Sequence, residues 1–137
     1  MIEVVAYEQA KAEIDAWIEY RKLTPTQIEA HKQSIETLIE GIQYGMLTLK
    51  DNCFTQTLLF PIGKDGQIKQ LQYGNRVNKL LLAPHLKGVA ADDGDERLIS
   101  YLSCLTEKTD GVVRQHLIQL DSQDNRIAMS IVVFFLS

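Results

Sequence analysis

The chain has 137 residues, with 14 lysines and arginines against 18 aspartates and glutamates and a formal net charge of −4. A hydrophobic fraction of 45% with 23% charged residues is typical of a globular domain and excludes a disordered chain. The acidic balance argues against a nucleic-acid binder, and no apolar run approaches the roughly 20 residues of a membrane-spanning helix.

The acidic excess is confined to the first third of the chain. Residues 1–48 carry four basic and eight acidic side chains, which gives −4, whereas residues 49–137 carry ten of each sign. The same first third has purely helical patterning. We therefore divide the chain into a helical hairpin over 1–48 and a β-hairpin with helices over 49–137, and expect the two parts to form one compact unit.

An apolar stripe predicts a helix over about residues 7–22. Its members recur at helical spacing: Ala10, Ile14, Trp17 and Ile18. A second helix begins with Thr24 as N-cap, Pro25 at the first helical position and Gln27 three residues after the cap, the pattern of a capping box. Its apolar face extends to about Gly45.

Two strands follow, and together they predict an antiparallel hairpin. Residues 54–60 are rich in aromatic, β-branched and aliphatic side chains, and we expect Pro61 to end this strand. The turn spans residues 63–66, whose Asp-Gly pair favours positive φ. Residues 67–73 alternate polar and apolar side chains. The packed positions are Ile68 and either Leu71 or Tyr73.

Four helical segments complete an α+β fold, mostly helical, in which the β-hairpin packs on three to four short helices. They comprise a short one ended by Pro84, one from Asp95 to about Leu105, one from Asp110 to about Leu120, and one from Asp121 to the end. The last is apolar almost all round, which is typical of a buried or interfacial helix. A strand over 131–136 is the alternative, and the strong cap Asp121 favours the helix.

The sequence shows no motif of a known chemistry. The histidines (His31, His85 and His116) and the cysteines (Cys53 and Cys104) lie far apart without metal-ligand or CxxC spacing. We interpret the cysteines as reduced packing residues and expect a cytoplasmic address, because the N-terminus also lacks the pattern of a signal peptide. A cysteine–histidine nucleophile pair is one enzymatic alternative, and an enzyme would need an enclosed polar pocket around Cys104 or His116.

The acidic residues have structural interpretations. Asp92, Asp93, Asp95 and Glu96 lack the alternating ligands of a calcium loop, so a solvated loop leading into a helix explains them. Asp121 and Asp124 suit helix capping better than acid–base catalysis. We therefore predict no catalytic, cofactor-binding or metal-binding residue, no cofactor and no enzyme activity.

Protein binding is the function that this composition favours. The C-terminal run carries more apolar faces than a small core absorbs, and the hairpin leaves strand edges open for pairing. We expect a protein partner, or a second copy of the chain, and neither nucleic acid nor membrane. The predicted binding residues are Ile68, Leu71, Val132, Phe134, Phe135 and Leu136. The alternative is that these residues form the core of the chain itself.

The region from about residue 54 to the end resembles the small tail assembly chaperones of tailed bacteriophages. The resemblance is carried by the order of four patterns: Leu59-Phe60-Pro61, a glycine turn with a second strand, Leu98-Ile99 followed by Leu102, and Leu120-Asp121 with Asp124 before the closing Phe134-Phe135-Leu136. It implies binding of an aggregation-prone tape measure protein during tail assembly. The two helices before residue 49 depart from that pattern, which leaves a structural or adaptor subunit of a phage-tail-like assembly as the alternative function.

Overall fold

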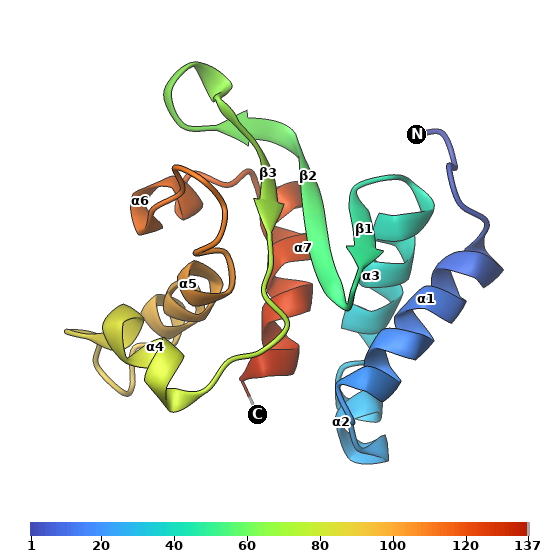
Figure 1. Ribbon diagram of the computed structural model, residues 1–137, viewed down its shortest axis with the longest axis horizontal. Helices are drawn as coiled ribbons and strands as arrows, with labels where there is room; N and C mark the ends of the chain where they lie inside the picture. The colour runs from blue at the N-terminus through green and yellow to red at the C-terminus, as the bar shows by residue number, and fades with distance from the viewer. Residues whose placement is uncertain (137) are drawn as a thin grey trace.

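The computed structural model describes residues 1–136 and shows an α+β fold (Figure 1). The described residues form α-helices, two 3-10 helices (η) and one small sheet. In chain order the elements are α1 (Tyr7–Tyr20), α2 (Pro25–Ala30), α3 (Lys32–Gln43), β1 (Leu47–Lys50), β2 (Cys53–Ile62), η1 (Lys64–Gly66), β3 (Ile68–Gln72), α4 (Lys79–Leu86), α5 (Gly94–Leu105), α6 (Arg114–Leu117), α7 (Ser122–Val132) and η2 (Val133–Phe135).

The sheet has three antiparallel strands in the order β1-β2-β3, one more than the sequence predicts. Leu47 pairs with Gln56 across β1 and β2, and Gln56 also faces Leu71 of β3. The added strand is β1, and a two-residue turn at Asp51 and Asn52 joins it to β2. The φ values of these residues, 52° and 61°, give the backbone twist of a tight hairpin turn. Aspartate and asparagine tolerate positive φ, so this turn is the signal that the sequence prediction missed.

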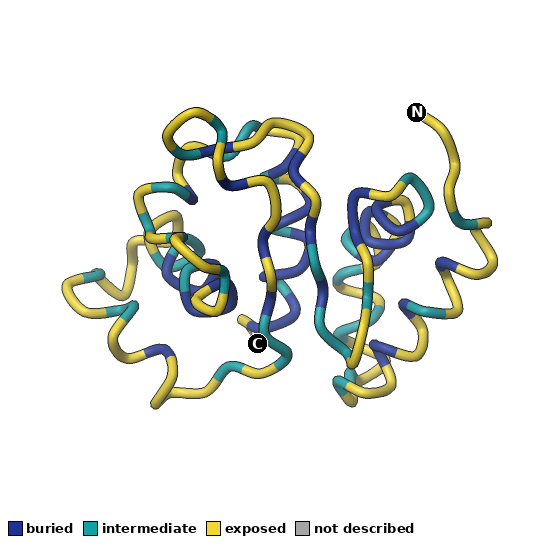
Figure 2. Tube along the Cα trace, turned by 45° about the horizontal axis from the view of Figure 1, so that its top comes forward, coloured by how far each residue is buried: buried dark blue, intermediate teal, exposed yellow. Residues whose placement is uncertain are grey.

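One face of the sheet is buried and the other is polar. In Figure 1, α3 lies behind β1 and α7 lies behind the other strands, and α3 contacts β1 while α7 contacts β2. Side chains alternate accordingly: Phe54, Gln56 and Leu58 of β2 are buried, whereas Thr57 is exposed. Figure 2 shows buried positions gathered where the strands lie against α7. This alternation is the pattern of an antiparallel sheet with one solvated face.

The predicted capping box is present at the start of α2. The backbone N–H of Gln27 donates to Thr24 Oγ1 at 3.2 Å, and the N–H of Thr24 donates to Gln27 Oε1 at 2.9 Å. The sequence predicts one continuous helix from this cap to about Gly45, and this prediction is wrong. The helix breaks at His31, whose φ of −114° and ψ of 26° lie outside the helical region, and resumes as α3.

The sequence predicts that Pro61 ends a strand and that Pro84 ends a helix, and both predictions are wrong. β2 continues through Pro61 to Ile62, and its pairing with β3 shifts register between Thr57 and Ile62, where a missing N–H is tolerated. Pro84 lies inside α4 rather than ending it. The carbonyl that loses its helical bond there belongs to Leu80, which is highly exposed, so water can replace the missing donor.

The helices after residue 90 follow their caps. Asp93 caps α5 and Asp121 caps α7, each accepting a backbone N–H, at 3.2 Å from Glu96 N and at 2.9 Å from Gln123 N. The helix predicted from Asp110 to Leu120 is only four residues long as α6. Gly111 has a φ of 75°, outside the helical region, so the chain cannot continue as a helix there.

The first third of the chain packs on the rest. α1 contacts α3, and α3 contacts α7. Trp17 of α1 meets the ring of Phe54 in β2 at 5.0 Å between centroids. The boundary expected near residue 48 falls inside β1, and a continuous set of buried side chains extends across it.

Candidate functional site

The C-terminal apolar residues expected to bind a partner lie in the core. Val132, Phe134 and Phe135 are all buried, and Trp17 meets Phe134 at 5.4 Å between ring centroids with an interplanar angle of 85°. The expectation that they form an open surface is wrong. The chain's own first helix provides the aromatic ring that covers them, so burial is achieved within one molecule.

The hairpin residues expected beside them are also buried. Ile68 and Leu71 of β3 are exposed by only 6% and 0%. Of the six predicted binding residues only Leu136, with 41% of its surface exposed, reaches solvent. Period-two alternation marks which side of a strand is apolar, and it does not show whether helices of the same chain cover that side.

Arg21 also ties α1 to the C-terminal segment. Its Nη2 donates to the carbonyl of Phe134 at 3.2 Å, its Nη1 donates to the carbonyl of Asn75 at 3.3 Å, and its Cζ lies 4.1 Å from the ring centre of Phe135. Burial lowers the pKa of Arg21, and the nearby Arg76 adds to this effect. The guanidinium satisfies a carbonyl at the end of the helical C-terminal region and covers an aromatic face at the same time.

A different apolar surface is exposed on β2. Leu59, Phe60 and Pro61 are consecutive and all exposed, with 55% of the surface of Phe60 open to solvent. In a regular strand consecutive side chains point to opposite faces, so three exposed neighbours indicate a local irregularity. We call Leu59, Phe60 and Pro61 the apolar strand surface.

A buried carboxylate holds this irregularity in place. Asp124 Oδ1 accepts from the N–H of Leu59 at 2.8 Å, and Oδ2 accepts from the N–H of Phe60 at 3.0 Å. Asp124 is fully buried, and its backbone carbonyl accepts from Gln56 Nε2 at 2.9 Å. The sequence-based assignment of Asp124 to helix capping is therefore wrong. Its carboxylate satisfies two adjacent N–H groups of a strand that bulges away from its partner.

The outer edge of the hairpin is blocked at one point. Thr109 Oγ1 accepts from the N–H of Gln72 at 2.8 Å and lies 3.2 Å from the carbonyl oxygen of the same residue. A side chain thus occupies the position that the backbone of an added strand would take. This contact reduces the open edge that the sequence predicts for pairing.

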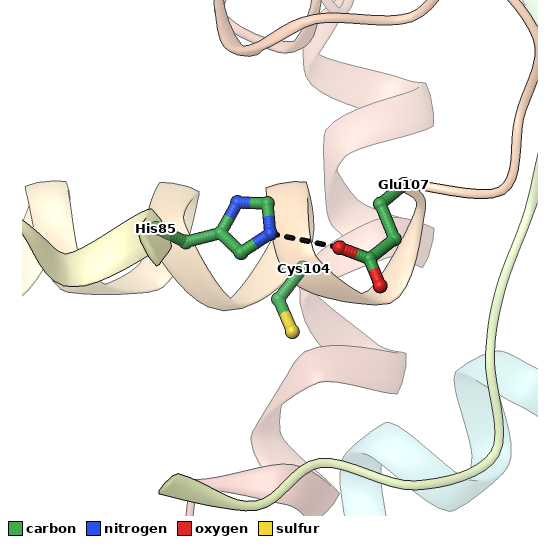
Figure 3. Close-up of side chains that lie close together, drawn as sticks. All are labelled: His85, Cys104 and Glu107. Carbon is green, nitrogen blue, oxygen red and sulfur yellow. Dashed lines mark hydrogen bonds and ion pairs between the residues drawn. The ribbon is translucent and has the colours of Figure 1, made fainter. Parts of the chain in front are cut away.

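One cluster of chemically active side chains lies where α4 and α5 meet (Figure 3). His85 Nε2 lies 2.9 Å from Glu107 Oε2, and His85 Nδ1 lies 3.1 Å from Ser103 Oγ. The thiol of Cys104 is the third potential ligand, and the ligand atoms of His85, Cys104 and Glu107 lie within 4.8 Å of one another. Burial raises the pKa of the Cys104 thiol, and the Glu107 carboxylate raises it further.

This cluster was not visible in the sequence. Cys104 lies at the end of α5, Glu107 follows in the turn after that helix, and His85 comes from α4, so the spacing resembles no metal motif. A hydrolytic function for the Ser103–His85–Glu107 chain has little support. Ser103 lies within α5, where helical bonding engages the backbone N–H groups that an oxyanion hole would need.

The other two histidines have partners outside this cluster. The ring of His31 meets Phe134 edge-on at 5.2 Å, and His116 Nδ1 accepts from the N–H of Val113 at 3.1 Å. Within residues 1–136, none of the helices has both the length and the apolar character needed to cross a bilayer. No protein-family model matches the chain, and neither a curated protein nor a solved structure matches it.

Proposed function

We propose that this protein is a non-enzymatic assembly factor that binds an apolar partner polypeptide through the apolar strand surface. The partner class is the one that the sequence resemblance implies, a tape measure protein kept from aggregating before a phage tail forms around it. The observation that carries the proposal is the fixed exposure of Leu59 and Phe60, whose backbone N–H groups are both held by Asp124.

Rigidity makes this surface suited to binding. An exposed aromatic residue on a backbone that is already ordered loses little conformational entropy when a partner covers it. Aromatic side chains also contribute a large share of the energy at protein interfaces. Phe60 combines both properties, since its ring is exposed while its N–H is anchored to a fully buried carboxylate.

The charge distribution supports the same role. The net charge of −4 lies in residues 1–48, which include α1, α2 and α3. The apolar strand surface belongs to β2, outside this acidic part of the sequence. A partner that exposes apolar helical faces aggregates unless those faces are covered. A complex that presents an acidic helical region outward stays soluble through charge repulsion.

The test is an aggregation assay with a tape measure fragment, encoded by the nearest long helix-rich reading frame. Light scattering of the fragment is followed alone, with the wild-type protein, with Phe60→Ser and with Leu80→Ser. Leu80 is the matched control, because it is highly exposed on α4. We expect wild type and L80S to suppress scattering and F60S to fail. Failure of wild type, or full suppression by F60S, would overturn the proposal.

An adaptor or structural subunit is the second candidate, favoured by the closed C-terminal core. Because Phe134 and Phe135 are covered by Trp17 and Arg21, the folded chain has no need of a partner to bury them. Such a subunit remains in the finished particle, whereas a chaperone leaves it. Mass spectrometry of purified particles separates these outcomes, since only a retained subunit is found at constant stoichiometry.

A further inference from the structure

The cluster at the α4–α5 junction contains the donor set of a metal site. His85 supplies a ring nitrogen, Cys104 a sulfur and Glu107 a carboxylate oxygen, all within 4.8 Å of one another. Nitrogen, sulfur and oxygen donors in this combination suit zinc, a borderline-soft ion without a geometric preference of its own. We propose that His85, Cys104 and Glu107 bind one zinc ion, with its fourth position open to solvent.

The side chains must move to enclose an ion, because the three ligand atoms are spread over up to 4.8 Å. Bonds of about 2.0–2.3 Å place the ligand atoms of a tetrahedral zinc ion about 3–4 Å apart. His85 Nε2 and Glu107 Oε2 now lie 2.9 Å apart, so the ion would separate them slightly and replace their hydrogen bond. Cys104 lies in the last turn of α5, and Glu107 lies just beyond the C-cap Thr106, in the turn that follows the helix.

Ser103 orients the histidine for this role. In the structure Nε2 faces the Glu107 carboxylate, which can only accept, so Nε2 carries the ring proton and donates. Zinc binding therefore requires the other tautomer: Nε2 gives up its proton to bind the ion, and Nδ1, 3.1 Å from the Ser103 hydroxyl, takes up a proton from solvent and donates to Ser103 Oγ. Histidines that bind metals usually donate their second ring nitrogen in this way. Ser103 is therefore a positioning residue, and it does not bind the ion.

The cysteine must lose a proton on binding. In the metal-free protein the Cys104 sulfur lies 3.5 Å from the carbonyl oxygen of Leu81, the geometry of a weak S–H hydrogen bond. Zinc binds the thiolate, so one proton leaves the sulfur for solvent as the S–Zn bond forms, and no electron is transferred. Glu107 supplies the carboxylate oxygen, and at 45% exposure its side chain is the ligand nearest to solvent.

A pocket gives access to the fourth position. A cavity of about 170 Å³ is lined by Cys104 and Glu107 together with Arg76 and Lys108. A zinc ion with three protein ligands keeps one position for water or an added ligand. The two cationic side chains favour an anion there, such as hydroxide or a carboxylate. This site is separate from the apolar strand surface, so either proposal can fail without the other.

The test is a cobalt titration of the tag-free, reduced protein, with zinc as competitor. We expect one equivalent of Co²⁺ to give a thiolate-to-cobalt charge-transfer band that Zn²⁺ abolishes. Cys104→Ser should remove the band, and Cys53→Ser, which changes the chain's other free cysteine, should keep it. Ser103→Ala should weaken binding by about 10- to 100-fold while the band stays unchanged in shape.

Two further variants protect the test from loss of folding. Glu107→Gln changes a side chain that is 45% exposed and His85→Gln one that is 19% exposed, so both should keep the circular dichroism of wild type while losing tight binding. The absence of a charge-transfer band in folded wild-type protein would overturn the proposal. So would a band that persists in C104S, or weak binding that all variants share, which would indicate ions held by surface carboxylates.

Discussion

Trp17 and Phe134 meet edge-on, 117 residues apart in the sequence, with ring centroids 5.4 Å apart. Trp17 also contacts the rings of Phe54 and Phe135, at 5.0 Å and 6.4 Å between centroids. One indole of the first helix therefore joins the sheet and the C-terminal segment in a single aromatic cluster. This cluster explains how the C-terminal aromatic rings are buried within the chain itself.

Removing the ring of Phe134 should strongly destabilise the fold. We expect Phe134→Ala to lower the free energy of unfolding by about 3–5 kcal/mol, because the fully buried ring leaves a cavity beside Trp17. Leu136→Ala is the control, at 41% exposure, and should change it by only about 0.5 kcal/mol. Chemical denaturation followed by Trp17 fluorescence measures both. Equal effects would mean that the C-terminus is not sealed in the monomer.

Replacing Asp124 should disrupt the bulge of β2. Asp124→Asn keeps one carbonyl oxygen but turns an amide N–H₂ toward the N–H of Leu59 or Phe60, so one buried donor loses its acceptor. We expect a loss of about 2–3 kcal/mol in unfolding free energy. Asp121→Asn, at the N-cap of the same helix, should be nearly neutral because asparagine caps as well as aspartate. If both variants match wild type in urea denaturation, the carboxylate does not hold the bulge.

Tyr73 should make stability depend on alkaline pH. Burial raises the pKa of this phenol far above its ordinary value of 10.0, and the charge of Asp124 adds to the shift. The unfolded tyrosine ionises above pH 10 while the folded one does not, so its contribution is complete below pH 10 and decreases as the pH rises further.

Tyr73→Phe isolates this effect. At pH 7 the variant should be less stable by about 1–3 kcal/mol, because Gln56 Oε1 loses the hydroxyl that donates to it at 2.6 Å. Above pH 10 the difference from wild type should narrow by about 1.4 kcal/mol per pH unit. Denaturation curves of both proteins between pH 7 and 11 measure this difference in unfolding free energy. A constant difference over that range would contradict the raised pKa.

Gly41 should not tolerate a side chain. A Cβ at this position of α3 would lie 2.8 Å from Cδ1 and 3.1 Å from Cγ of the buried Leu47. We expect Gly41→Ala to cost about 1–3 kcal/mol for the displaced leucine, against about 1 kcal/mol gained in helix propensity. Gly94→Ala is the control, because nothing lies within 4 Å of its Cβ. Thermal unfolding should show a lower midpoint for G41A and an unchanged or higher one for G94A.

Local hydrogen bonding explains which elements the sequence predicts well. The capping box of Thr24 and Gln27 and the cap at Asp121 involve groups within three residues of each other, so their geometry depends little on the rest of the fold. The ends of strands and helices were predicted less well. Pro61 lies within β2 where the pairing with β3 shifts register, and Pro84 lies within α4 one turn after the highly exposed Leu80, so the missing N–H is tolerated at both positions.

The amino-acid sequence by itself determined the α+β class, the helix caps at Thr24 and Asp121, the β2–β3 hairpin and the amount of apolar surface to be buried. Only the tertiary structure decided where that surface goes and which polar groups meet. Trp17 covers Phe134, Asp124 reaches the backbone of Leu59, and His85 joins Cys104. Burial is non-directional, so a pattern shows that a face is apolar but not which distant segment covers it.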